Sequence, residues 1–275
     1  MQYPPVRPPA VAGRFYPARA ETLHRDVEKY LAPPPESAEK IENALGCVVP
    51  HAGYMYSGHV AGAVYRRLPA RASYVILGPN HTGRGAPVAM MSSGRWLMPL
   101  GEVAIEGDLA HQIHQGCRLV TDDAAAHADE HSLEVQLPFL QRTVKDFHFV
   151  PIAIGATRYA GLEALGRGLA QAARHVSAPF LVIASSDMNH YEPDGITRVK
   201  DGKAIERILA LDPEGLYEVL QREDISMCGY GPAIAMLTFA KEMGARQAEL
   251  VKYATSADTS GDRSAVVGYA GIIVS

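Results

Sequence analysis

Histidine and aspartate residues follow three apolar runs that resemble buried strands. VVPHAGYMYSG places His51 after the first run, VILGPNH places His81 after the second, and LVIASSDMNHY places Asp187 and His190 after the third. In an open α/β sheet, ligands bind in the crevice beyond the carboxyl ends of the strands, and clustered titratable groups mark such sites. The repeated pattern therefore predicts that these side chains share one site.

The residue types at these positions are those of a transition-metal site. Imidazole binds a first-row metal through one nitrogen while an acceptor holds the other nitrogen. Two histidines need an anionic third ligand to bind an ion such as Fe²⁺ or Zn²⁺ firmly, and Asp187, Glu130, Glu134 and Cys228 are the candidates. Cys228, in SMCGYGP, lies in a turn-like segment that opens a helix, where the helix N-terminus would stabilise a thiolate.

Further candidates for the pocket lie in or near the same segments. Tyr54 and Asn80 accompany the first two histidines, and His131 lies in HADEH. HADEH differs from the zinc-protease helix in the place of its acid, and no third ligand is spaced for that motif. We expect His127, its first histidine, to be exposed.

The elements that would position these residues alternate between strand and helix. Apolar runs predict strands at 46–50, 73–79, 147–155 and 179–187, whereas helical spacing predicts helices at 21–32, 58–68, 108–116, 132–144, 159–176, 197–220 and 232–244. The helix at 132–144 is expected to be interrupted or kinked at Pro138. Residues 87–105 favour antiparallel strands, and two strands at 248–257 and 264–274 close the chain. This order predicts an α/β fold, a three-layer sandwich whose central mixed sheet is flanked by helices.

Composition limits the class of protein. The chain has 275 residues, 47% of them hydrophobic and 20% charged, and its one proline-rich stretch, 32–35, follows the first helix, so we expect a single domain over 1–275. A net charge of −4 argues against nucleic-acid binding, and the apolar runs are too short to cross a membrane. The N-terminus lacks the pattern of a signal peptide, and three widely separated cysteines do not form a disulfide framework, which indicates a cytoplasmic protein. Cys47 and Cys117 are expected to be packing residues.

An ordered set of motifs gives the chain a family resemblance. AGRFYP, PHAGYMYSG, ILGPNH, EHSLEVQLPF, SSDMNHY, MCGYGP and SGDRSAVVGYAGI occur in this order over nearly the whole length. Together they resemble the Memo family, whose bacterial and archaeal members are labelled AmmeMemoRadiSam system protein B. That label implies two partners, a radical SAM protein and a small companion protein.

The resemblance also implies a fold and a set of ligands. The Memo fold is similar to that of class III extradiol ring-cleaving dioxygenases, which hold non-haem Fe(II) with two histidines and a carboxylate. By this resemblance His51 and His81 are the histidine ligands and Cys228 is the third ligand. Asp187 and His190 line the same pocket, and His190 resembles the acid–base histidine of the dioxygenases. A thiolate in place of the carboxylate admits copper and zinc besides Fe(II), and it is itself oxidisable.

Three functions compete at this point. The first is a metal-dependent redox enzyme that uses O₂ or a related oxidant. The second is a non-catalytic metal carrier or peptide-binding scaffold that serves its system partners. The third, a metal-dependent hydrolase, ranks last: Asn80-His81 matches the Asn-His of metallophosphoesterases, but the upstream Asp-x-His and Gly-Asp motifs are missing.

Overall fold

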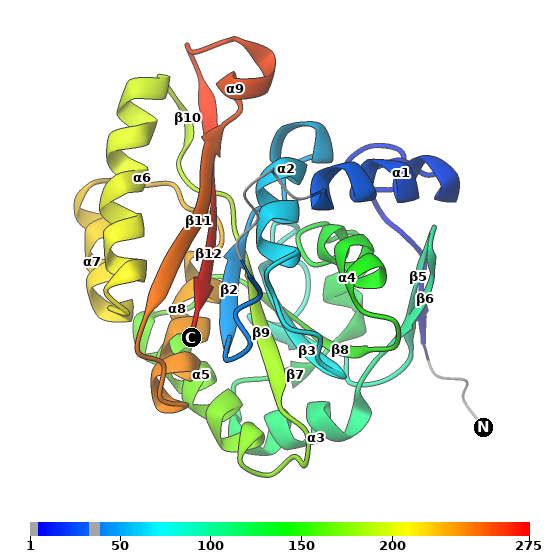
Figure 1. The fold of residues 1–275 in the computed structure, drawn as a ribbon. Helices are drawn as coiled ribbons and strands as arrows, with labels where there is room; N and C mark the ends of the chain where they lie inside the picture. The colour runs from blue at the N-terminus through cyan, green and yellow to red at the C-terminus, as the bar shows by residue number, and fades with distance from the viewer. Residues whose placement is uncertain (1–4, 33–38) are drawn as a thin grey trace.

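The computed structural model describes residues 5–32 and 39–275 (Figure 1). Residues 33–35 of the proline-rich stretch lie outside the described residues. The strands are β1 (Val6–Arg7), β2 (Gly46–Val49), β3 (Ser73–Pro79), β4 (Val88–Met90), β5 (Arg95–Met98), β6 (Gly101–Ala104), β7 (Thr121–Asp122), β8 (His148–Ile154), β9 (Phe180–Ser185), β10 (His190–Glu192), β11 (Ala248–Thr255) and β12 (Val266–Val274). The helices are α1 (Ala20–Leu31), α2 (Tyr54–Tyr65), α3 (Gly107–Gly116), α4 (Leu137–Thr143), α5 (Tyr159–Ala173), α6 (Asp194–Leu209), α7 (Pro213–Arg222), α8 (Tyr230–Glu242) and α9 (Ala257–Ser260). Two short 3₁₀ helices span Ala124–His127 and Glu134–Gln136.

A large mixed sheet forms the centre of the molecule. Its strand order is β10-β12-β2-β9-β3-β8-β4-β7, and β11 pairs with β12. The four inner strands β2, β9, β3 and β8 are parallel, whereas β12 runs antiparallel to β2 and β4 runs antiparallel to β8. A separate small sheet has the order β1-β5-β6. Because the inner strands are parallel, their carboxyl ends lie at one edge of the sheet.

Helices cover both faces of the large sheet, because successive strand residues point to opposite faces. In β2, Cys47 and Val49 pack into the apolar cluster that includes α1, α2 and α4, whereas Val48 packs into the cluster with α3, α5 and α8. Figure 1 shows α1, α2 and α4 apart from α3, α5 and α8, with strands between the two groups. The predicted three-layer α/β sandwich with a mixed central sheet is confirmed.

Two local predictions need correction. The segment 132–144 is not one helix kinked at Pro138: a 3₁₀ turn precedes α4, and Pro138 lies in the first turn of α4. Proline is tolerated there because the first helical N–H groups have no partner within the helix. The segment 197–220 is likewise two helices, α6 and α7, and Pro213 lies in the first turn of α7.

Many of the hydrophobic side chains are buried in the two clusters that pack against the sheet. Within residues 5–32 and 39–275, no helix combines the length and the hydropathy needed to span a bilayer.

Candidate metal centre

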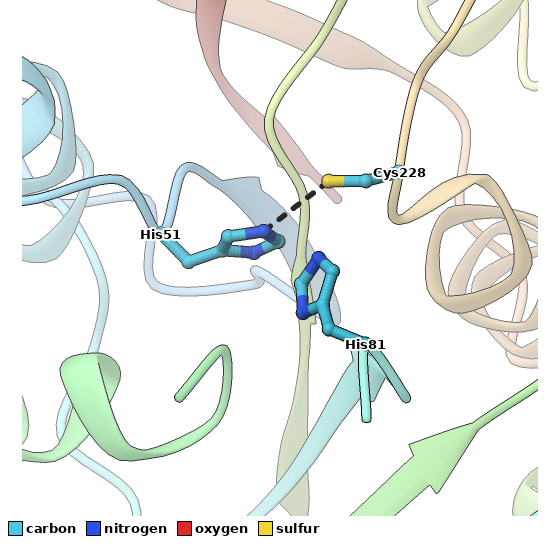
Figure 2. A group of neighbouring side chains, drawn as sticks. All are labelled: His51, His81 and Cys228. Carbon is cyan, nitrogen blue, oxygen red and sulfur yellow. Dashed lines mark hydrogen bonds between the residues drawn. The ribbon is translucent and has the colours of Figure 1, made fainter. Parts of the chain in front are cut away.

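Three side chains from distant parts of the chain converge at the carboxyl edge of the sheet. His51 follows β2, His81 follows β3, and Cys228 precedes α8. Each offers a ligand atom, and these atoms lie within 4.8 Å of one another. The sulfur of Cys228 is 3.2 Å from Nε2 of His51, and Figure 2 shows a ring nitrogen of His81 directed toward both. We call His51, His81 and Cys228 the strand-end cluster.

A close approach of two backbones brings Cys228 to the strand ends. Gly229 donates its N–H to Oγ of Ser186 at 3.0 Å. A Cβ atom on Gly229 would lie 2.3 Å from the carbonyl oxygen of Ser185, at the end of β9. Only glycine fits at such a distance, so Gly229 allows the turn before α8 to pack against β9.

Hydrogen bonds fix which nitrogen of His51 is available to a ligand. Ser185 Oγ donates to the carbonyl oxygen of Ser132 at 2.6 Å and accepts from Nε2 of Gln136 at 2.8 Å. Since its one proton is committed, Ser185 Oγ is an acceptor for Nδ1 of His51, which lies 3.0 Å away. His51 therefore carries its proton on Nδ1, and its Nε2 lone pair faces Cys228.

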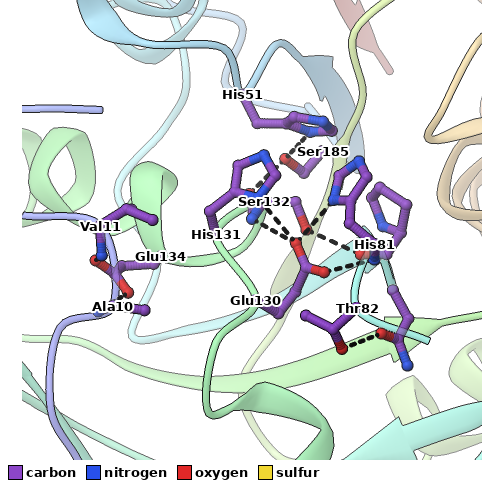
Figure 3. Close-up of polar contacts among 12 residues, drawn as sticks. Ala10, Val11, His51, His81, Thr82, Glu130, His131, Ser132, Glu134 and Ser185 are labelled. Atoms are coloured by element: carbon purple, nitrogen blue, oxygen red, sulfur yellow. Dashed lines mark hydrogen bonds and ion pairs between the residues drawn. The ribbon is translucent and has the colours of Figure 1, made fainter. Parts of the chain in front are cut away.

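Glu130 is the hydrogen-bond partner of Nδ1 of His81, as Ser185 is for His51 (Figure 3). Its buried carboxylate accepts from the backbone N–H of His81 at 2.6 Å and lies 2.9 Å from Nδ1 of His81. Burial alone would raise the pKa of Glu130, but the hydrogen bonds and charge of His81 and the N–H of Ser132 lower this pKa to about 2. An ionised carboxylate only accepts, so a neutral His81 carries its proton on Nδ1 and keeps the Nε2 lone pair free.

The ring planes separate the strand-end cluster from a second group of donors. An imidazole lone pair lies in the plane of its ring. The planes of His51 and His81 are inclined at 81°, so their lone pairs can meet at one point. Atoms of His81, Glu130 and His131 also lie within 4.8 Å of one another, but the rings of His81 and His131 are stacked at 21°. Nearly parallel rings direct their lone pairs side by side, so this second group is a poor metal site.

Burial shifts the titration of the cluster residues. It lowers the pKa of His51, with further lowering by the neighbouring histidines, and so favours the neutral imidazole that metals require. It also raises the pKa of the Cys228 thiol, with a further rise caused by Asp187. A free Cys228 is therefore a thiol, and a bound cation would have to stabilise its thiolate.

Asp187 and His190 lie beside the strand-end cluster. One carboxylate oxygen of Asp187 accepts the N–H of His51 at 2.8 Å and of Ala52 at 3.2 Å, so it orients the loop after β2. Burial raises the pKa of Asp187 to about 7, although these hydrogen bonds oppose the rise. Nδ1 of His190 lies 2.9 Å from the carbonyl oxygen of Ser226, which leaves Nε2 for other partners.

The other predicted pocket residues have different places. Tyr54 is buried among aromatic rings and donates its hydroxyl to the carbonyl oxygen of Val135 at 2.6 Å. Asn80 closes its own loop through a bond to the carbonyl oxygen of Arg84 at 2.7 Å. His131 stacks on His81 and stands at the edge of the strand-end cluster.

Two other predictions concern residues outside the cluster. His127 is not exposed: it is fully buried beside Trp96. The 3₁₀ turn at Ala124–His127 packs against β4, and Arg7 donates to the carbonyl oxygen of His127. Glu134, a candidate ligand, is committed to Arg7 and to the N-terminal segment, whereas Cys47 and Cys117 are buried free thiols, as expected.

One surface cavity is at the opposite end of the sheet. It measures about 520 Å³ and is lined by Ser73 and Phe180 at the starts of β3 and β9, with His111 and His175. No set of three converging metal ligands lies there among the described residues. The groups of three converging potential metal ligands among the described residues lie at the carboxyl edge instead.

Sequence reasoning missed the residues that hold the ligands. The roles of Ser185, Gln136 and Arg7 could not be predicted, because their hydrogen-bond partners are distant in the sequence. Glu130 did give a signal, as a carboxylate in the motif HADEH, but it holds a ligand instead of joining the cluster.

Comparison with known proteins shows the family of the chain. The family model described as Memo-like protein matches residues 7–273. The chain is 46% identical over 276 residues to a MEMO1 family protein of Pyrobaculum arsenaticum, covering 98% of each chain. It is 47% identical over 278 residues to a MEMO1 family protein of Ignicoccus hospitalis, covering 97% of this chain and 98% of that protein. A MEMO1 family protein of Methanopyrus kandleri is 45% identical over 277 residues, with 97% and 98% covered. The chain belongs to the Memo family.

Proposed function

We propose that the strand-end cluster binds one transition-metal ion and that the protein performs metal-dependent redox chemistry. The observation that carries the proposal is the convergence of three donor atoms within 4.8 Å, two of them imidazole nitrogens with free lone pairs. Both imidazoles are held through their other nitrogen, as metal-binding histidines are.

The donor set fits a divalent ion with borderline or soft character. Two neutral imidazoles and one thiolate suit iron, copper and zinc, and the family resemblance favours Fe(II) among them. Binding would deprotonate Cys228 and release its proton, since burial otherwise keeps this thiol protonated. Glu130 adds a fixed negative charge behind His81 and makes that imidazole a stronger donor.

Residues beside the cluster supply groups for proton transfer. An iron or copper ion bound here would supply a redox couple and a position for an oxidant or substrate. His190 is held through Nδ1, so Nε2 is the atom that we propose exchanges a proton with a substrate. Asp187 orients the backbone at His51 and would keep that ligand in place as the substrate reacts.

The setting of this activity is also part of the proposal. A radical SAM protein and a small companion protein are the proposed partners, on the strength of the family resemblance. Three free thiols and no disulfide among the described residues support a cytoplasmic location.

The second candidate is a non-catalytic metal carrier or scaffold with the same cluster. Its supporting observation is Cys228 itself, because a thiolate beside an oxidant is readily oxidised. A carrier would use the soft sulfur to hold the metal and would need no proton-transfer group. Loss of proton transfer at His190 would then leave function intact.

Anaerobic purification followed by metal analysis tests the proposal. We expect about one bound ion per chain after addition of Fe(II), and loss of this ion in His51→Ala and His81→Ala variants. O₂ consumption with a panel of catechols then separates enzyme from carrier. Metal bound without any O₂ consumption would favour the carrier, whereas equal metal content in wild type and both variants would contradict the site.

A further inference from the structure

We propose that Arg7, far from the strand-end cluster in the sequence, is a positioning residue that sets the geometry of His81 through Glu130. The inference rests on the proposed function, since its readout is the affinity of the cluster for a metal. Arg7 lies in β1 and is only 5% exposed.

The guanidinium of Arg7 binds three points of the segment that contains Glu130. Nε donates to the carbonyl oxygen of His127 at 2.6 Å, and Nη2 donates to the carbonyl oxygen of Glu130 at 2.8 Å. Nη1 donates to the carboxylate of Glu134 at 2.6 Å. The planar group also lies 3.9 Å from the centre of the Trp96 ring. Such a rigid fork fixes three acceptors at once, which a lysine ammonium cannot do.

A second set of bonds ties the rest of the N-terminal segment to the same place. The Glu134 carboxylate accepts from the N–H groups of Ala10 and Val11 at 2.8 and 3.1 Å. The hydroxyl of Tyr16 donates to it at 2.5 Å. Figure 3 shows Glu134 beside Ala10 and Val11, on the side of Glu130 away from His81. The ion pair of Arg7 and Glu134 therefore holds the N-terminal segment against the segment 127–134.

The path from Arg7 to the cluster is short. Arg7 fixes the carbonyl group of Glu130, and the side chain of the same residue fixes both the backbone N–H and Nδ1 of His81. A shift of the Glu130 backbone would tilt the imidazole of His81, whose Nε2 faces the other donors. Displacement of such a hydrogen-bond partner typically weakens metal binding 10–100-fold.

Co(II) is the probe, because its absorption spectrum reports ligand geometry and its affinity can be measured by competition with a chelator. Arg7→Lys retains the positive charge but loses the planar guanidinium that donates to three acceptors at once. We expect it to weaken Co(II) binding about tenfold and to change the visible spectrum. The variant Arg7→Met with Glu134→Gln removes both charges, which avoids a lone buried carboxylate, and should weaken binding at least as much.

A matched control separates positioning from general stability. Arg67 is also largely buried, is paired with Glu249, and donates to the carbonyl oxygen of Glu39 at 3.2 Å. The variant Arg67→Met with Glu249→Gln should lower the melting temperature yet leave Co(II) affinity within about twofold, since it lies outside the path to His81.

A double-mutant cycle decides whether Arg7 acts through Glu130. In a Glu130→Gln background, Arg7→Lys should have little further effect on Co(II) affinity, because the link is already broken. Full additivity, or a folded Arg7→Lys protein with wild-type affinity and spectrum, would overturn the inference. A wild type that binds no Co(II) at the cluster would instead overturn the proposed function, so the two failures are distinguishable.

Discussion

Two buried carboxylates, Glu130 and Asp201, have pKa values that shift in opposite directions. Glu130 accepts from His81 and from the N–H of Ser132, and the pKa of its carboxyl falls to about 2. Asp201 accepts from the N–H of Asn189 at 2.9 Å and from the hydroxyl of Tyr253 at 2.7 Å. Burial raises the pKa of Asp201 to about 6, although both hydrogen bonds oppose the rise. A buried acid thus stays charged only where its donors outweigh the cost of burial.

The two carboxylates also support different parts of the proposed chemistry. Glu130 touches His81 itself, so its charge acts on a metal ligand. Asp201 acts through Asn189, whose Oδ1 accepts from Ser226, and Ser226 in turn holds His190. In the proposed function, Glu130 would therefore influence metal affinity, and Asp201 would help to position the group for proton transfer.

The largest effect should come from His190. His190→Ala removes the proposed proton-transfer atom, so any O₂-dependent turnover found for the wild type should fall about 10²–10⁴-fold. Metal content should stay near the wild-type value, because the three ligands remain. Parallel metal analysis and O₂ uptake check both parts, and loss of the metal would make His190 a ligand instead.

Glu130→Gln should give the next largest effect. The amide cannot provide the negative charge behind His81, so metal affinity should fall about 10–100-fold. The matched variant Asp201→Asn, which alters an equally buried acid without contact to a ligand, should change affinity by no more than about twofold. Chelator competition measures both. Equal losses in the two variants would remove the distinction between the two carboxylates.

The pKa of Asp201 leads to a prediction about stability. A folded pKa of about 6, against 3.8 for a free aspartate, means that the native state binds more protons than the unfolded state between these values. The contribution of Asp201 to stability is therefore present below pH 4 and is lost as pH rises to about 6. Asp201→Asn should flatten this part of the pH profile in urea unfolding of the metal-free protein. An unchanged slope would show that Asp201 is ionised throughout.

The smallest effect is expected at His131. Its ring stacks on His81 at 21° and cannot share a metal ion with it, so a phenylalanine of similar shape should preserve the stack. We expect His131→Phe to change metal affinity by less than about twofold, measured by the same competition. A loss as large as that of a Glu130 variant would show that His131 binds the metal.

The positions of the inner strands and of the residues at their ends could be predicted from the sequence. The apolar runs placed β2, β3 and β9, and so placed His51 and His81 at one edge of the sheet. Pro138 and Pro213 were harder to interpret, because proline can end a helix or begin one, and only the packing decides.

The partners of the ligands could not be read from the sequence. Arg7 meets Glu130 across more than a hundred residues, and local patterns carry no information about such a contact. His127 was expected at the surface because it stands in a polar motif, but it is buried beside Trp96 in a turn that packs against β4. The Arg7 side chain joins these segments, and the sequence alone does not reveal their pairing.

The claim that His51, His81 and Cys228 hold one metal ion is tested most directly by X-ray absorption spectroscopy of the protein loaded with Zn²⁺ or Fe(II). The account predicts imidazole scattering together with a single sulfur, which for zinc lies at about 2.3 Å. In Cys228→Ser the sulfur contribution should disappear while the imidazole scattering remains. A wild-type spectrum without sulfur, or one that Cys228→Ser leaves unchanged, would contradict the account.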